Sequence, residues 1–224
     1  MHIKIQPITL PLPFRMGYVN CYLIETGNGY ILIDTGGSHN RKELTRELDV
    51  AGCRPGLLKL IILTHGDFDH SGNAAYLREA FGARIAIHRD DAGMVERGDM
   101  FVNRKKTNIL IGKMIPLFAG FGRSERFTPD LHIEDGDDLS GYGIDARVLS
   151  TPGHSKGSIG ILTANNELFC GDLFENLTNP SLNSIMDDPE TAKASVDMLK
   201  GYDIKTVYPG HGDFFMMEQF MTTI

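Results

Sequence analysis

The feature that most constrains the fold is a loop, residues 63–73, with the sequence Leu-Thr-His-Gly-Asp-Phe-Asp-His-Ser-Gly-Asn. Before it, residues 57–63 form an apolar run with the length and β-branched content of a buried strand. After it, residues 74–81 predict a helix that stops at Gly82. Two histidines and two aspartates therefore crowd a short loop between a strand end and a helix start. This placement predicts a preorganised site on an α/β scaffold.

Helix capping is the alternative explanation for these polar residues. Carboxylates before a helix often satisfy its free N–H groups, and for Asp69 alone capping is the simpler interpretation. Capping does not explain the two histidines. The cluster as a whole therefore favours a set of metal ligands, which comprises His65, Asp67, Asp69 and His70.

Composition excludes several classes of protein. A chain of 224 residues allows one large domain spanning 1–224. Its net charge of −7, without clustered lysine or arginine, argues against a nucleic-acid partner. Three widely spaced cysteines form neither a disulfide framework nor a cysteine zinc site, which favours a reducing, cytoplasmic location. We expect no signal peptide and no membrane span, because the N-terminus lacks the signal-peptide order and no apolar run approaches about 20 residues. A homodimer is compatible with this composition.

The remaining chain predicts strands and helices in alternation. A hairpin turn is expected at 27–29, where Asn and Gly tolerate positive φ. Asp188 followed by Pro189 is a strong helix start. The predicted strands are at 3–5, 18–24, 30–34, 83–88, 144–149, 158–162, 167–170 and 204–207, and the other predicted helices are at 41–50 and 189–200.

Residues 89–130 break this alternation. Methionines, phenylalanines and aliphatic residues are interleaved there with Arg104, Lys105 and Lys106. We expect a helical and loop insertion, with a helix over 102–115 and a Gly-rich loop over 116–129. Such a segment either packs into the core or lines an apolar substrate pocket.

Three further residues share the setting of the central loop. His154, Asp172 and His211 each follow the end of a predicted strand, beside a glycine. Asp34 also ends a predicted strand, where the residues alone leave it either a turn former or a support for the site.

These motifs together resemble the metallo-β-lactamase superfamily. The family loop is Thr-His-x-His-x-Asp-His, and Thr64 to His70 matches it except that Asp67 replaces the second histidine. Pro-Gly-His-Ser at 152–155, Gly-Asp at 171–172 and Pro-Gly-His-Gly at 209–212 resemble the later metal motifs, and Asp-Thr-Gly at 34–36 resembles the early turn. The resemblance spans nearly the whole chain.

The resemblance implies a four-layer αβ/βα sandwich with two divalent metal ions. It implies that His65, Asp67 and His154 hold one metal, that Asp69, His70 and His211 hold the second, and that Asp172 bridges them. It also implies that Asp34 and Thr64 support these ligands. Imidazole and carboxylate ligands suit Zn²⁺, Fe²⁺ or Mn²⁺. The extra carboxylate at Asp67 leads us to expect Fe or Mn at least as readily as Zn.

The leading interpretation is a hydrolase that acts on a small-molecule lactone, thioester or carboxylic ester. The resemblance implies attack by a hydroxide that bridges the metals, with Asp69 as the catalytic residue that orients it or moves its proton. The alternatives are a diiron oxidoreductase related to the flavodiiron branch, which would need a separate electron donor, and a phosphodiesterase. The Gly-x-Ser-x-Gly pattern at 153–157 matches serine hydrolases formally, but a strand rather than a helix is predicted after it.

Overall fold

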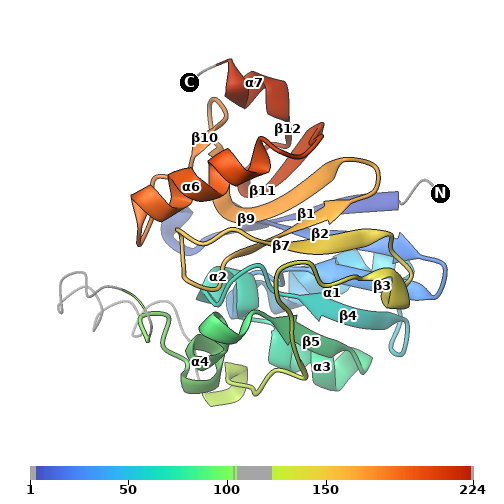
Figure 1. The fold of residues 1–224 in the computed structure, drawn as a ribbon. Coiled ribbons are helices and arrows are strands. Elements are labelled where there is room, and N and C mark those ends of the chain that lie inside the picture. The colour runs from blue at the N-terminus through green and yellow to red at the C-terminus, as the bar shows by residue number, and fades with distance from the viewer. Residues whose placement is uncertain (1–3, 103, 105–122, 223–224) are drawn as a thin grey trace.

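Two β-sheets lie face to face in the computed structural model, with helices on the outer face of each (Figure 1). The structure describes residues 4–102, 104 and 123–222. The strands are β1 (Lys4–Pro11), β2 (Tyr18–Thr26), β3 (Gly29–Ile33), β4 (Leu58–Ile62), β5 (Arg84–Ile87), β6 (Leu131–His132), β7 (Ala146–Ser150), β8 (Ile159–Thr163), β9 (Glu167–Asn176), β10 (Ser181–Leu182), β11 (Thr206–Gly212) and β12 (Phe215–Met216). The α-helices are α1 (Arg41–Val50), α2 (Phe68–Ser71), α3 (Ala74–Phe81), α4 (Arg89–Arg97), α6 (Pro189–Leu199) and α7 (Met217–Met221).

The first sheet has the order β1-β2-β3-β4-β5-β6. Its first three strands are antiparallel neighbours, and β3 to β6 run parallel to one another. Parallel neighbours need a crossover connection, and the segments carrying α1 and α3 supply two of them. The loops that follow β3 and β4 therefore emerge at the same edge of this sheet.

The second sheet has the order β12-β11-β9-β8-β7, with β10 paired to β9. Its central pair, β9 and β11, is parallel, and the other neighbours are antiparallel. The ladder between β9 and β11 shifts register twice, around Pro209. These irregularities lie where the second sheet approaches the polar loop after β4.

Side-chain alternation along the strands builds the layers. On β3, Ile31 and Ile33 pack between the two sheets, whereas Leu32 points to the helices on the other face. On β9, Phe169 joins the core between the sheets, and Cys170 packs on the side of α6 and α7. Three buried clusters thus fill the three spaces between four layers. This arrangement confirms the predicted αβ/βα sandwich.

The predicted helices at 41–50 and 74–81 are confirmed as α1 and α3. Gly82 ends α3 in the left-handed conformation, with φ of 73°. The side chain of Asp188 accepts a hydrogen bond from the Thr191 backbone and so caps α6. These boundaries were predictable because each depends on a local residue preference.

Two predicted strand ends were wrong. Asp172 lies inside β9 and His211 lies inside β11, rather than after them. The strands continue past these residues because β9 keeps pairing with β10 and β11, while Gly171 (φ of 51°) and the register shifts absorb the local bend. Sequence patterns did not indicate this long-range pairing.

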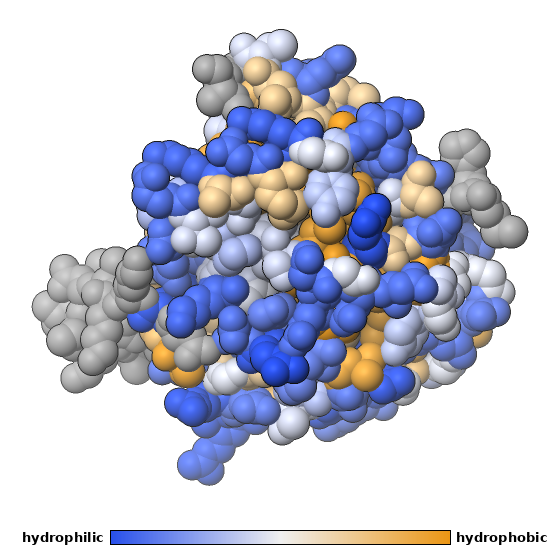
Figure 2. All heavy atoms as spheres, in the orientation of Figure 1, coloured by the Kyte–Doolittle hydropathy of each residue, from blue (hydrophilic) through white to orange (hydrophobic). Residues whose placement is uncertain are grey.

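The segment 89–130 begins with α4, whose Ala92 and Val95 pack into the core on the helix side of the first sheet. The predicted helix over 102–115 lies mostly outside the described residues. Figure 2 shows one face of the molecule, covered largely by hydrophilic residues, with a limited hydrophobic area near its middle. Among the residues that the structure describes, each helix falls short of the length and apolarity that crossing a bilayer requires.

Candidate metal centre

All seven candidate ligands meet at the edge where β3, β4, β7, β9 and β11 bring their polar residues together. His65 and Asp67 lie in the loop after β4, Asp69 and His70 lie on α2, and His154 follows β7. Asp172 and His211 project from β9 and β11 of the other sheet. The site therefore spans the junction of the two sheets, and each half of the chain contributes to it.

The first half-site consists of His65, Asp67 and His154. The Oδ2 atom of Asp67 lies 3.1 Å from His154 Nε2 and 3.7 Å from His65 Nε2. All three side chains are buried. Their ligand atoms therefore face one another in a space closed to bulk solvent.

The second half-site consists of Asp69, His70 and His211. The Nε2 atoms of the two histidines are 3.5 Å apart, and Asp69 Oδ2 lies 3.5 Å from His211 Nε2 and 3.9 Å from His70 Nε2. The side chains of Asp69 and His211 are 14% and 15% exposed. This half-site is consequently the more open of the two.

Asp172 lies between the half-sites. Its Oδ1 is 3.3 Å from His70 Nε2, and its Oδ2 is 3.8 Å from His154 Nε2 and 3.4 Å from His211 Nε2. Donor atoms around one tetrahedral metal lie about 3.3–3.6 Å apart, given bonds of about 2.0–2.2 Å. The spacing within the cluster is close to this range, and Asp172 is placed to serve both half-sites.

Every histidine in the cluster presents the same nitrogen to its centre. The Nδ1 atoms of His70, His154 and His211 lie 2.8, 2.7 and 2.7 Å from Asp34 Oδ2, the Ile185 carbonyl and the Tyr18 carbonyl, respectively. The Nδ1 of His65 lies 3.0 Å from Thr64 Oγ1. An acceptor at Nδ1 fixes the tautomer and leaves Nε2 with a free lone pair, which is the arrangement that metal-binding histidines require.

Asp34 is held in a conformation that its residue type rarely adopts. Its φ is 58°, in the left-handed region, and the residue is buried. Its carboxylate accepts hydrogen bonds from the Thr64 backbone and the Thr64 hydroxyl, both at 2.8 Å, and contacts His70. Because three contacts determine this geometry, the strained turn is stable, and Asp34 orients both the loop and a histidine.

Orphaned polar atoms test whether the site fits metal ions. His65 Nε2 and Asp172 Oδ1 are buried and have no hydrogen-bond partner among the described residues, whereas Asp67 Oδ1 is paired with Arg104 Nη2 at 2.8 Å. A buried polar atom without a partner is costly, and here two such atoms belong to the same cluster. A divalent cation at each half-site would satisfy them, so the donor set fits two metals of the Zn, Fe or Mn type.

The buried charges are strongly coupled. Burial lowers the pKa of His65 well below its usual range, which keeps that ring neutral. Burial opposes ionisation of Asp172, but His211 and His70 hold the pKa of that carboxyl well below its usual value. Burial also opposes protonation of His211, yet the neighbouring Asp172 raises the His211 pKa to about 9. Asp172 is therefore the anionic centre of the site.

Three residues of the site were not predicted: Asp91, Arg104 and Asp187. The Nη2 atom of Arg104 lies 2.9 Å from Asp67 Oδ2, and its Nε lies 3.3 Å from Asp187 Oδ2. Burial would raise the Asp67 pKa, but the Arg104 guanidinium holds it well below its usual range. Arg104 appears in the sequence only as part of a basic stretch, so no local pattern indicated this contact.

Asp91, on α4, joins the two loops of the first half-site. It accepts hydrogen bonds from Gly66 N at 3.0 Å, Gly157 N at 2.9 Å and Ser155 Oγ at 2.6 Å. Gly66 adjoins His65, and Ser155 adjoins His154. Asp91 is completely buried. This carboxylate fixes the spacing between loops that are about 90 positions apart in the sequence.

The same contacts bear on two alternatives raised by the sequence. Ser155 is buried and donates to Asp91, and β8 rather than a helix follows it, so residues 153–157 do not form a nucleophile elbow. Asp69, for which capping was the simpler interpretation, lies within the first turn of α2 rather than before it. Asp67 is the residue before α2, and its side chain makes no capping hydrogen bond within the described part of the chain. Its carboxylate faces His154 and Arg104 instead.

Gly210 is required by the close packing of the ligands. A Cβ at this position would lie 2.3 Å from Asp172 Oδ1 and 2.7 Å from His70 Cε1. Both distances are far below van der Waals contact. The glycine beside His211 therefore allows Asp172 and His70 to approach each other.

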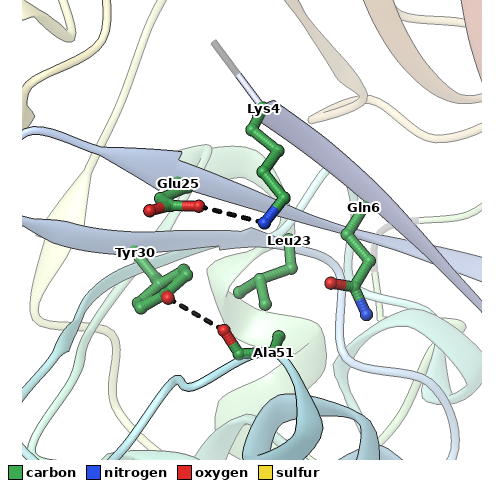
Figure 3. Close-up of a pocket in the computed structure, with 6 residues that line it drawn as sticks. All are labelled: Lys4, Gln6, Leu23, Glu25, Tyr30 and Ala51. Atoms are coloured by element: carbon green, nitrogen blue, oxygen red, sulfur yellow. Dashed lines mark hydrogen bonds and ion pairs between the residues drawn. The ribbon is translucent and has the colours of Figure 1, made fainter.

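A shallow recess elsewhere has no comparable chemistry. Figure 3 shows its lining at the other end of the first sheet, where Lys4 pairs with Glu25 and the Tyr30 hydroxyl donates to the Ala51 carbonyl. Glu25 is seven residues along β2 from Tyr18, the residue whose carbonyl contacts His211, which corresponds to about 23 Å. The charged groups of this recess are already paired, and we assign it no function.

Comparisons with known proteins agree with this architecture. A family profile described as the metallo-β-lactamase superfamily matches residues 15–211. The chain is 27% identical to hydroxyacylglutathione hydrolase GloC of Haemophilus influenzae, with 98% of this chain and 94% of the other covered. It is 28% identical to acyl-coenzyme A thioesterase MBLAC2 of Bos taurus, with 89% and 75% covered.

A solved structure, TTHA1623 in a di-iron-bound form, is similar to the chain with a TM-score of 0.72 and 29% identity. The similarity covers 96% of each chain. The likeness therefore extends over nearly the whole sandwich.

Proposed function

The chain belongs to the metallo-β-lactamase superfamily, and on that premise we propose that it is a dinuclear metal-dependent hydrolase that cleaves a thioester. The observation that carries the proposal is that four histidine Nε2 atoms lie within 4.0 Å of the Asp172 carboxylate. Asp67 and Asp69 each lie within 4.0 Å of two of these nitrogens. Two similar proteins are named as a hydroxyacylglutathione hydrolase and an acyl-coenzyme A thioesterase, and both names describe thioester cleavage. These names favour a thioester over a lactone or a carboxylic ester.

The proposed ligands divide as the half-sites do. His65, Asp67 and His154 would hold one metal, Asp69, His70 and His211 the other, and Asp172 would contact both. Two such ions supply a nucleophile at neutral pH by lowering the pKa of bound water, and they polarise the substrate carbonyl. Everything else in the reaction depends on how this chain positions the reactants.

Asp69 is the residue that we propose to accept and return the proton of the attacking water. It is the most open of the three carboxylates in the cluster, and its Oδ2 lies 3.5 Å from His211. Burial raises the pKa of Asp69, although His70 opposes the rise. A raised pKa makes this carboxylate a better base near neutral pH.

Apolar residues flank the cluster and suit an acyl group. The carbonyls that orient His211 and His154 belong to Tyr18 and Ile185, whose side chains are 59% and 69% exposed. Each half-site therefore has an exposed apolar residue directly beside it. Such residues can cover the carbon chain of a substrate while its carbonyl lies at the cluster.

The test is a thiol-release assay on the metal-loaded protein. Acyl-coenzyme A and S-acylglutathione thioesters are compared with lactones, carboxylic esters and a phosphodiester. We expect thioesters to be hydrolysed with the highest kcat/KM. Asp69→Asn keeps one oxygen for the second metal but loses the base, so we expect it to reduce kcat strongly in protein that elemental analysis shows to be loaded. Asp197→Asn, an exposed carboxylate of α6, is the matched control and should leave kcat unchanged. Preference for the phosphodiester, or activity in Asp69→Asn equal to wild type, would refute the proposal.

A diiron oxidoreductase is the second candidate, and the similarity to a protein solved in a di-iron-bound form favours it. The carboxylate at Asp67 also suits iron or manganese better than a third imidazole would. Elemental analysis of the purified protein, followed by thioesterase assays and by oxygen-consumption assays with an added electron donor, in the Zn, Mn and Fe forms, separates the two. Hydrolysis with all three metals, and no oxygen uptake by the iron form above the background of the donor alone, would exclude the redox function.

A further inference from the structure

Arg104 places a guanidinium inside the first half-site. Its Nη2 atom lies 2.8 Å from Asp67 Oδ1, 2.9 Å from Asp67 Oδ2 and 3.2 Å from His154 Nε2. The side chain is only 6% exposed. These three atoms belong to two of the three residues that we assign to the first metal.

The guanidinium is fixed from its other side as well. Its Nε lies 3.3 Å from Asp187 Oδ2, in the loop before α6. Arginine presents its N–H groups in a rigid planar fork, so two carboxylates on different edges determine its position closely. Arg104 is therefore held in the half-site by Asp187 as well as by Asp67.

The position of Nη2 conflicts with full metal coordination. It lies almost equally far from both oxygens of Asp67, which is the place that a cation bound by both oxygens takes. It also adjoins His154 Nε2, whose lone pair a metal needs. A metal at the first half-site must therefore displace the guanidinium from His154 and share Asp67 with it.

The second half-site lacks such a competitor. Among the residues that the structure describes, the cluster formed by Asp69, His70 and His211 is contacted by carboxylates and histidines, and by no lysine or arginine. The two half-sites thus offer similar donor sets, but only one of them carries its own cation.

We propose that Arg104 is a resident cation that competes with metal for the first half-site and sets its metal affinity. This inference rests on the proposed metal assignment and is independent of the substrate. It predicts that removing the positive charge strengthens metal binding, although the same change removes the partner of two carboxylates.

The experiment measures Zn²⁺ and Mn²⁺ affinity by competition with a chromophoric chelator. Two backgrounds isolate the half-sites: His211→Ala weakens the second, and His154→Ala weakens the first. Arg104→Gln, which keeps much of the side-chain length without the charge, is added to each. In the His211→Ala background we expect at least tenfold tighter binding. In the His154→Ala background we expect no change.

Two matched variants control for charge and fold. Arg97→Ala removes an exposed arginine at the end of α4 and should leave both affinities unchanged. Arg104→Lys keeps the charge without the fork and should give an increase smaller than that of Arg104→Gln. Circular dichroism of chelator-treated protein establishes that each variant is folded, and Arg104→Lys provides the comparison if Arg104→Gln is not.

The possible outcomes distinguish the role of Arg104 from the assignment of the metal ligands. Equal or weaker binding in the Arg104→Gln, His211→Ala variant would overturn the role of Arg104 while leaving the metal assignment intact. A rise of the same size in both backgrounds would show a general charge effect and would also overturn it. Failure of every variant and of the wild type to bind either metal would refute the metal assignment together with this inference.

Discussion

The two half-sites differ in how the fold holds them rather than in their donor atoms. Each has two histidines and an aspartate and shares Asp172. The first is buried, and Asp91 and Arg104 brace it from the segment after β5. The second is partly open, and Asp34 and the Tyr18 carbonyl orient its histidines from β3 and β2. The two half-sites can therefore bind metal with different affinities although their ligands are similar. The substitutions below measure that difference.

The largest effect on metal content should come from a substitution that disturbs both half-sites at once. In Gly210→Ala, the new methyl group collides with Asp172 and His70, which displaces the carboxylate that both half-sites share. We expect loss of both metals by elemental analysis and activity below detection. Gly141→Ala, where a Cβ meets nothing within 4 Å, is the control and should keep wild-type metal content. Full metal content in Gly210→Ala would show that Asp172 is not shared.

The second effect should fall on the first half-site alone. Asp91→Ala unties the His65 loop from the His154 loop and leaves Gly66 N and Gly157 N without an acceptor. We expect affinity at the first half-site to fall about 10- to 100-fold, the usual cost of losing a group that orients ligands. Chelator competition in the His211→Ala background measures it. An equal loss in the His154→Ala background would mean that Asp91 supports the fold as a whole.

A smaller effect on the same half-site should come from Thr64→Val. The hydroxyl connects Asp34 to His65 Nδ1, and valine keeps the β-branched shape without the bridge. We expect the affinity loss to be concentrated in the first half-site, close to tenfold. Thr45→Val on α1, whose hydroxyl donates to the Arg41 carbonyl of the same helix, is the matched control. A larger loss at the second half-site would place the role of Thr64 in orienting His70 through Asp34.

The smallest effect should be the change of fold stability and metal affinity with pH, which follows the protonation of His211. Its pKa is raised from 6.5 to about 9, with Asp172 as the cause that outweighs burial. In chelator-treated protein, the protonated ring therefore stabilises the fold below about pH 6.5, and this contribution disappears as the pH rises through about 9.

Metal binding should respond to pH in the opposite direction. A metal requires the unprotonated ring, so affinity at the second half-site should rise with pH up to about 9. Thermal unfolding and chelator competition from pH 6 to 9.5, with His211→Ala as reference, measure the two trends. Metal affinity that is independent of pH in the His154→Ala background would contradict this assignment.

Local patterns along the chain were enough to predict the motif residues and the elements that carry them. Loop 63–73 identified four of the candidate ligands because they lie between a strand and a helix that local preferences define. Asp188 with Pro189 and the stop at Gly82 are local signals too, so α6 begins and α3 ends where predicted. The alternation of strands and helices predicted an α/β chain, and the resemblance of the motifs to the metallo-β-lactamase superfamily implied the layered αβ/βα class.

The tertiary structure decided what lies around those residues. Asp91, Arg104 and Asp187 contact partners 25 to 83 positions away, and no local pattern distinguishes them from ordinary surface charges. The same holds for the continuation of β9 and β11 past Asp172 and His211, which depends on pairing between strands far apart in the chain. Residue types specify which atoms can bind a metal, but only the packing of distant segments decides which charges share the space with them.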